Sequence, residues 1–152
     1  MIQNLHHLLT ATQLQKLTNE LDRNVVALFE LGMVHFNFAT SLSNKDWRQK
    51  TSRLYYAAYN VRRAIQLKHS GSFSTDSSDH RSVEQLPDQI ERRASHVAQL
   101  KTLRDDRNLC DYDAFAKESD LVISVNDAVE FTTQFIADSK SFLSSKGVSI
   151  KS

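Results

Sequence analysis

Apolar side chains recur every three or four positions along most of the chain, which is the period of an amphipathic α-helix. The first series predicts an N-terminal helix or helix pair and consists of Leu5, Leu9, Leu14, Leu17 and Leu21. The second is more regular and predicts one long core helix; it consists of Leu21, Val25, Leu28, Gly32, Phe36, Ala39 and Leu42.

A stop and restart is predicted at residues 43–46, where Ser43 and Asp46 are spaced like a capping pair. The next helix is expected from about Trp47 to Lys68. Residues 70–79 contain five Ser, one Gly, one Thr and two Asp, with Phe73 as the single apolar residue. This composition is typical of a loop.

Three further segments complete the pattern. A short amphipathic piece is expected at residues 80–86, and Pro87 lies where the first turn of a new helix tolerates it, with that helix continuing to about Leu109. A break is expected at residues 111–113, and residues 121–123 are apolar enough to be extended. The last helix is predicted from Ser124 to about Gly147.

Composition supports a helical fold. The chain has 152 residues, with only three Gly and one Pro, too few for the many tight turns of an all-β domain. We therefore predict one all-α domain over residues 1–152, with its core at about 20–145. Its expected architecture is an up-and-down antiparallel bundle of four to five helices.

Several classes of protein are disfavoured. One Cys excludes an internal disulfide framework and a Cys-based zinc site. We find no secretory signal at the N-terminus, and the longest apolar region, residues 25–39, is too short to span a bilayer. There is no Glu-x-x-His pair, no H-E-x-x-H and no Gly-rich phosphate loop. We expect a soluble cytoplasmic protein without metal, cofactor or membrane contact.

Charge is unevenly distributed, although the whole chain carries only +1. Residues 45–107 contain thirteen basic and eight acidic side chains, a net charge of +5, whereas the segments on either side are net negative. Nine arginines make up most of the surplus: Arg48, Arg53, Arg62, Arg63, Arg81, Arg92, Arg93, Arg104 and Arg107. Such a surplus fits either a solvated surface or a site for phosphate, which the planar guanidinium binds through two hydrogen bonds.

Two of these arginines lie beside an apolar helical stripe. Arg104 and Arg107 lie within two helical turns of Leu100 and Leu103. Their guanidinium groups are therefore expected beside the apolar stripe and not on the opposite, solvated face. A buried arginine needs an anion or an acceptor-rich pocket. An internal salt bridge to a nearby aspartate and a bound phosphate both meet that need.

Two segments resemble the HEPN superfamily. They are RLYYAAYNVRRA at residues 53–64 and LRDDRNLCDY at residues 103–112, with the turn containing His80 between them. The final helix, with Asp127 early and Phe142 late, also fits the family. The resemblance covers about residues 20–145 and implies a bundle that dimerises through the helices bearing these motifs. Active members are metal-independent ribonucleases in toxin–antitoxin, phage-defence and RNA-processing systems.

The family's catalytic signature is an Arg, a polar residue, and a His four to six residues after the Arg. Arg107 and Asn108 match its first half, but Tyr112 stands where the first His position falls. Tyr, with a reference pKa near 10, is a poorer base than His. An antiparallel dimer would be one way to bring His96 toward the partner's Arg107, and His80 would be another source of a proton-transfer group.

The resemblance thus implies an RNA or nucleotide partner and a homodimer, with an antitoxin or defence-complex protein as a further possible partner. Candidate catalytic residues are Arg107, Asn108 and Tyr112, and candidate phosphate-binding residues are Arg53, Arg104, His80 and His96. The leading expectation is an RNA-directed toxin or defence component, a metal-independent endoribonuclease if it is an enzyme. The alternative is a catalytically degenerate HEPN protein that binds a nucleotide or a protein as a scaffold, sensor or regulator.

Overall fold

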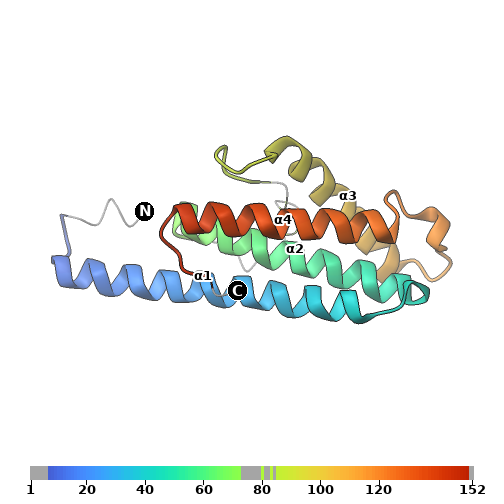
Figure 1. The fold of residues 1–152 in the computed structure, drawn as a ribbon, viewed down its shortest axis with the longest axis horizontal. Helices are drawn as coiled ribbons and strands as arrows, with labels where there is room; N and C mark the ends of the chain where they lie inside the picture. The colour runs from blue at the N-terminus through green and yellow to red at the C-terminus, as the bar shows by residue number, and fades with distance from the viewer. Residues whose placement is uncertain (1–6, 73–79, 81–82, 84, 151–152) are drawn as a thin grey trace.

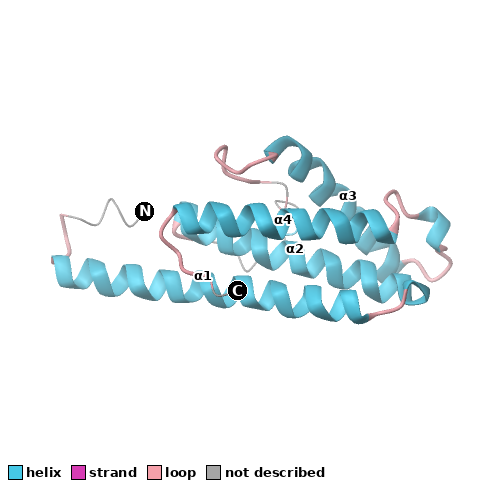
Figure 2. Ribbon diagram, viewed as in Figure 1, coloured by secondary structure: helices cyan, strands magenta, loops and turns pink. Residues whose placement is uncertain are grey.

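The computed structural model describes residues 7–72, 80, 83 and 85–150 and is helical (Figure 2). It contains four long helices and two short 3₁₀ helices and, over these residues, no strand. The elements in chain order are α1 (Ala11–Ser41), η2 (Asn44–Asp46), α2 (Trp47–Ser70), α3 (Arg93–Tyr112), η4 (Glu118–Asp120) and α4 (Val125–Ser145). The predicted all-α bundle is confirmed.

The helices run alternately in opposite directions (Figure 1). Helices α1, α2 and α4 extend along the long axis of the molecule, while α3 is inclined to them. Helix α2 packs against each of the other three long helices. It is therefore the central element. Leu54, Ala58, Val61 and Ile65 along its apolar face are fully buried, whereas Trp47 at its start is only partly buried.

Helices α1 and α2 approach each other closely at Gly32. A Cβ atom at this position would lie 2.7 Å from Val61 Cγ2 and 2.9 Å from the carbonyl oxygen of Ala57. Only a residue without a side chain allows the two backbones this separation. The small residues Ala57 and Ala58 on α2 are both fully buried.

Over the described residues, the N-terminal region forms one helix, α1, rather than a helix pair. Thr10 caps α1 by accepting a hydrogen bond from the backbone N–H of Gln13, whose side chain bonds back to the Thr10 N–H at 2.8 Å. This capping box fixes the start of α1 at Ala11. The predicted first leucine, Leu5, lies outside the described residues.

Helix α3 begins six residues after Pro87, so the predicted start was wrong. Pro87 instead opens a turn, in which its carbonyl accepts from the N–H of Ile90. The side chains of Leu86, Pro87 and Ile90 are buried, so packing onto the core holds this stretch in a non-helical path. Arg92 then adopts a left-handed conformation, φ 55°, immediately before the helix.

The expected break at residues 111–113 comes later than predicted, because α3 continues through Tyr112. The ion pair between Arg107 and Asp111 spans one turn and supports this last part of the helix. Only Asp113 leaves the helix, with its N–H bonded to Leu109 O at 3.1 Å.

Residues 121–123 are not a strand. The carboxylate of Asp106 accepts hydrogen bonds from the N–H groups of Val122, at 2.8 Å, and Ile123, at 3.1 Å. Asp106 is itself buried. The backbone of this connection is therefore held by a side chain of α3 and not by a neighbouring strand.

The ends of the other helices agree with the sequence. Ser124 caps α4 by accepting from the N–H of Asp127, and Gly147 follows that helix with φ 81°. Gly71, with φ 72°, ends α2 at the start of the serine-rich loop. Residues 73–79 of that loop, and residues 81, 82 and 84 of the expected amphipathic piece, lie outside the described residues.

Over the described residues, no helix is both long enough and apolar enough to cross a membrane.

Candidate functional site

Arg107 lies at the contact between α3 and α2, where its guanidinium meets a set of polar partners. It donates to the hydroxyl of Tyr56, to Asn108 Oδ1 at 3.0 Å, and to the hydroxyl of Tyr112 at 3.4 Å. Its Nε lies 2.8 Å from a carboxylate oxygen of Asp111. These five residues, Tyr56, Arg107, Asn108, Asp111 and Tyr112, are called the Arg107 cluster below.

Aromatic rings also surround this guanidinium. The Arg107 Cζ lies 5.8, 5.2 and 5.2 Å from the ring centroids of Tyr55, Tyr56 and Tyr112. Burial disfavours the charge of Arg107, but its bond to Tyr56 and the nearby Asp111 outweigh burial and raise its pKa. The cluster therefore holds a permanent cation whose side chain is 12% exposed.

Tyr112 gives the Arg107 cluster an exposed edge. Tyr112 is 76% exposed, whereas the side chain of Arg107 is mostly covered. The predicted trio of Arg107, Asn108 and Tyr112 thus does come together, although Tyr112 accepts from Arg107 and does not take the place of a histidine base.

His80 stacks in a second aromatic group beside the Arg107 cluster. The hydroxyl of Tyr55 lies 2.7 Å from His80 Nδ1, and the His80 ring is stacked 4.4 Å from that of Tyr59. Burial, with Tyr59 nearby, raises the pKa of Tyr55, so its hydroxyl keeps its proton. Because Tyr55 contacts both Arg107 and His80, one tyrosine ring connects the two predicted site residues.

Arg53 lies on the exposed side of α2 and contacts α1. Its Nη1 is 3.4 Å from Nδ1 of His35, and its guanidinium is 5.5 Å from the ring centroid of Phe38. A guanidinium only donates, so His35 Nδ1 is the acceptor and the neutral ring carries its proton on Nε2. Burial, followed by the charge of Arg53, lowers the pKa of His35.

His35 was not among the predicted site residues. Its ring is 5.7 Å from that of Tyr56, so it lies next to the Arg107 cluster from the α1 side. No local motif marks this residue, because its proximity depends on how α1 packs on α2. The sequence offers one cue to its orientation: His35 lies seven residues, about two helical turns, before Leu42, so it lies on the side of the helix that carries Leu42.

A groove of about 490 Å³ runs beside the Arg107 cluster. Its lining comes from α1, α2 and the end of α3 and consists of Phe38, Arg48, Gln49, Ser52, Arg53, Tyr56, Cys110 and Asp111. Two arginines, one phenol and one exposed phenyl ring give it the composition that phosphates and bases bind.

Arg48 is committed to the backbone within this groove. Its guanidinium donates to the carbonyl oxygens of Cys110 at 2.9 Å, Asp113 at 2.7 Å and Ala116 at 2.6 Å. These carbonyls include the end of α3, where the helix dipole favours a cation. Arg48 thus stabilises the end of α3.

Arg104 is paired with its neighbour. It donates to Asp105 Oδ1 from both Nε and Nη2 at 3.0 Å, and its side chain is 19% exposed. Of the two predicted partners for Arg104 and Arg107, a nearby aspartate or a bound phosphate, the structure without ligand shows the aspartates Asp105 and Asp111. Of the wider arginine surplus, Arg62 is buried, Arg63 lies over the ring of Tyr59, and Arg81 is outside the described residues.

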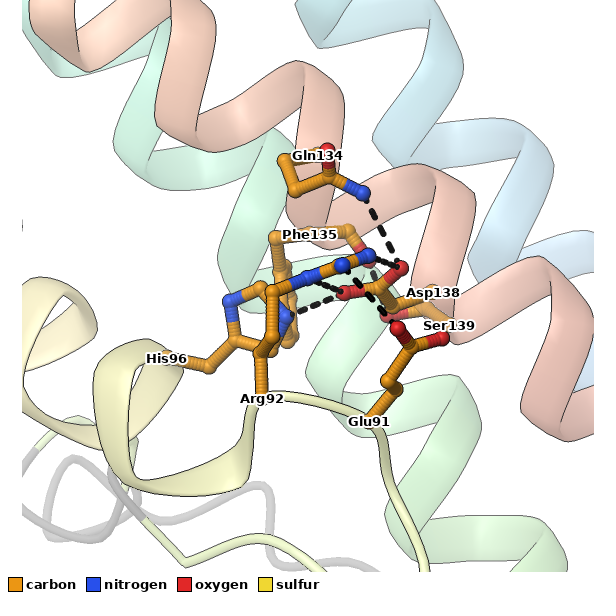
Figure 3. A network of polar contacts seen from close by, with 7 residues as sticks. All are labelled: Glu91, Arg92, His96, Gln134, Phe135, Asp138 and Ser139. Carbon is orange, nitrogen blue, oxygen red and sulfur yellow. Dashed lines mark hydrogen bonds and ion pairs between the residues drawn. The ribbon is translucent and has the colours of Figure 1, made fainter.

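His96 lies away from the Arg107 cluster of its own chain. It is 1% exposed, packs against Phe131 and Phe135 of α4, and has Nε2 2.7 Å from Asp138 Oδ2 (Figure 3). Within one chain the structure therefore does not bring His96 to Arg107.

Cys110 is buried, and burial raises its pKa to about 11, so the thiol stays protonated near neutral pH. In the part of the chain that the structure describes, no three His, Cys, Asp or Glu side chains gather as ligands for a metal ion.

Comparison of the chain with protein-family models, curated proteins and solved structures found no match.

Proposed function

We propose that this protein is an HEPN-like, RNA-directed component of a toxin–antitoxin or phage-defence system. It binds RNA phosphate at the Arg107 cluster and the adjacent groove. The observation that carries this proposal is the pairing of Arg107 with Tyr56, because it joins the two sequence segments of the resemblance in one cationic, aromatic-lined place.

The groove supports RNA as the ligand. Arg53 and Ser52 supply donors for phosphate oxygens, and the exposed rings of Phe38 and Tyr112 supply surfaces on which unpaired bases stack. The proposed functional form is a homodimer, as the resemblance implies, in which a protein partner such as an antitoxin controls access to the groove.

If the protein cleaves RNA, the reaction needs a base and an acid but no metal. The 2′-oxygen attacks the adjacent phosphorus while the bond from phosphorus to the 5′-oxygen breaks, leaving a 2′,3′-cyclic phosphate. The base removes the 2′-hydroxyl proton, and the acid protonates the departing 5′-oxygen. Arg107 stabilises the negative charge that develops on the phosphate. Tyr112 is unsuited to the base role, whereas His35 and His80 both border the cluster.

The alternative function is that of a degenerate HEPN protein that binds a nucleotide or a protein without cleaving RNA. One observation favours it: Asp111 already neutralises Arg107. A ligand phosphate would have to displace Asp111 or share the cation with it.

A binding and cleavage assay tests both functions. Fluorescence anisotropy with a labelled single-stranded RNA should show affinity that falls steeply with salt, as phosphate contacts require. Arg107→Ala should weaken binding at least tenfold. Arg23→Ala is the matched control, because Arg23 is an arginine on the exposed surface of α1, 79% exposed.

The same protein, incubated with RNA in EDTA, then distinguishes enzyme from binder. Cyclic-phosphate ends that disappear in Arg107→Ala support the ribonuclease. RNA binding without any cleavage supports the degenerate alternative, and equal RNA affinity of the wild type and Arg107→Ala would rule out this site.

A further inference from the structure

A second polar site lies at the start of α3, away from the Arg107 cluster. Its centre is the buried carboxylate of Asp138 on α4, which is 4% exposed (Figure 3). Arg92 donates to both oxygens of this carboxylate, and Gln134 Nε2 donates to Oδ1 at 3.0 Å. His96 Nε2 completes the set at 2.7 Å.

The donors around Asp138 determine which ring nitrogen of His96 carries a hydrogen. Hydrogen bonds from Arg92, His96 and Gln134 outweigh the desolvation of Asp138 and lower its pKa. Because an ionised carboxylate only accepts, His96 Nε2 carries a hydrogen. In the neutral ring, Nδ1 is then an acceptor.

That acceptor has no partner among the described residues. His96 Nδ1 is buried and makes no hydrogen bond, and Figure 3 shows it pointing away from Asp138. An acceptor buried without a partner is costly, and buried polar groups in native proteins are nearly always satisfied. A donor from outside the chain would remove this cost.

A groove beside His96 has room for such a donor. It measures about 380 Å³ and lies between α3 and α4. Apart from His96 and the ring of Phe131, its lining is polar: Arg92, Ser95, Gln99, Asp127, Glu130 and Gln134.

We propose that this groove binds a cationic amino or guanidino group, with one N–H donated to His96 Nδ1 and the charge balanced by Glu130 and Asp127. The sign of the ligand follows from the local charges. Arg92 is already paired with Asp138 and, at 3.0 Å, with Glu91. The two remaining carboxylates of the groove leave it net negative.

The same chemistry has two sources, a small diffusible amine and an arginine side chain of a peptide. Agmatine and the peptide Gly-Gly-Arg-Gly-Gly represent them in parallel calorimetric titrations of the full chain. Tighter binding of agmatine indicates the diffusible source, and tighter binding of the peptide indicates the protein source. Failure of both to bind would overturn the proposal, as would preferential binding of inorganic phosphate.

Variants locate the bound group. Glu130→Gln should weaken agmatine binding at least fivefold, whereas Glu118→Gln, an exposed acidic residue on η4, should leave it unchanged. His96→Gln should weaken it at least tenfold. Equal affinities for the wild type and Glu130→Gln would count against the site.

The wild-type protein supplies a readout that survives if His96→Gln does not fold. Agmatine should shift the ¹⁵N resonance of His96 Nδ1 in the direction of a hydrogen-bonded acceptor, while Nε2, bonded to Asp138, changes less. An unchanged Nδ1 resonance at saturating agmatine would contradict the proposal. This outcome is independent of RNA binding, since the two sites share no residue.

Discussion

The guanidinium of Arg107 on α3 donates a hydrogen bond to the phenol oxygen of Tyr56 on α2. These residues are 51 positions apart in the chain. Their contact joins two helices at the place where both carry an unusual density of aromatic and basic side chains. It determines which way Arg107 points and makes the geometry of the cluster dependent on helix packing.

Replacing Tyr56 with Phe tests that dependence. Loss of a bond to a charged donor should lower the free energy of unfolding by about 2 kcal/mol, and RNA affinity should fall because Arg107 loses its orientation. Urea denaturation and anisotropy measure the two effects. Tyr112→Phe is the matched control, since its bond to Arg107 is longer and exposed. A larger loss of stability in Tyr112→Phe than in Tyr56→Phe would contradict this interpretation.

Gly32→Ala should destabilise the protein by about 2 kcal/mol, as overpacking of a tight contact does. The added methyl group meets both a Val61 methyl group and the backbone oxygen of Ala57, and the backbone atom cannot rotate away. Thermal denaturation provides the measurement.

Gly147→Ala is the comparison for that variant, because nothing lies within 4 Å of its Cβ position but its φ is +81°. It should cost about 1 kcal/mol through backbone strain alone. Adding Val61→Ala to Gly32→Ala should restore only part of the stability, since the clash with Ala57 remains. Full restoration would show that the backbones are not in the close contact described.

Asp138→Asn should lower the free energy of unfolding by about 2 kcal/mol at pH 7, because it weakens the hydrogen bonds that Arg92, Gln134 and His96 donate to a buried carboxylate. Its effect should also depend on pH. The pKa of Asp138 is lower in the folded than in the unfolded protein, so its stabilising contribution is present above the unfolded value of 3.8 and is lost as pH falls through the lower folded value.

Denaturation curves of the wild type and Asp138→Asn between pH 2 and 7 therefore should converge at the acid end. Parallel curves at all pH values would mean that the carboxylate is not the ionised acceptor for Arg92, Gln134 and His96.

Asp106→Ala should loosen the connection between α3 and α4. Removing the carboxylate leaves the N–H groups of Val122 and Ile123 without their acceptor, so their hydrogen exchange should accelerate at least tenfold. Asp106→Asn keeps one oxygen acceptor and should have a smaller effect. Unchanged exchange at Val122 in Asp106→Ala would contradict the assigned role of Asp106.

Helical periodicity was sufficient to predict an all-α bundle of four to five helices, because each long helix has one apolar face turned toward the core. It failed at the start of α3. Local signals favoured Pro87 as the first turn, whereas burial of Leu86 and Ile90 holds the chain in a turn there. It gave no firm prediction at residues 121–123, where the backbone N–H groups of Val122 and Ile123 donate to a carboxylate on another element.

The candidate site also combines features set by local sequence with features set by contacts between helices. Arg107, Asn108 and Tyr112 lie within two turns of one helix, so their association was predictable from sequence spacing. The neighbours that give Arg107 its environment, Tyr56 and His35, come from α2 and α1. No pattern along the chain encodes these contacts, since they arise from the separation and rotation of packed helices.

Arg48 has a consequence for any anion that approaches this part of the molecule. The last carbonyls of a helix carry partial negative charge, and those of α3 lie beside the groove next to Arg107. By donating to three carbonyl oxygens here, Arg48 cancels a repulsion that would otherwise oppose phosphate. Arg48, which uses three of its five N–H donors on these carbonyls, thus acts as an electrostatic shield, and the helix end it covers becomes a surface that a polyanion tolerates.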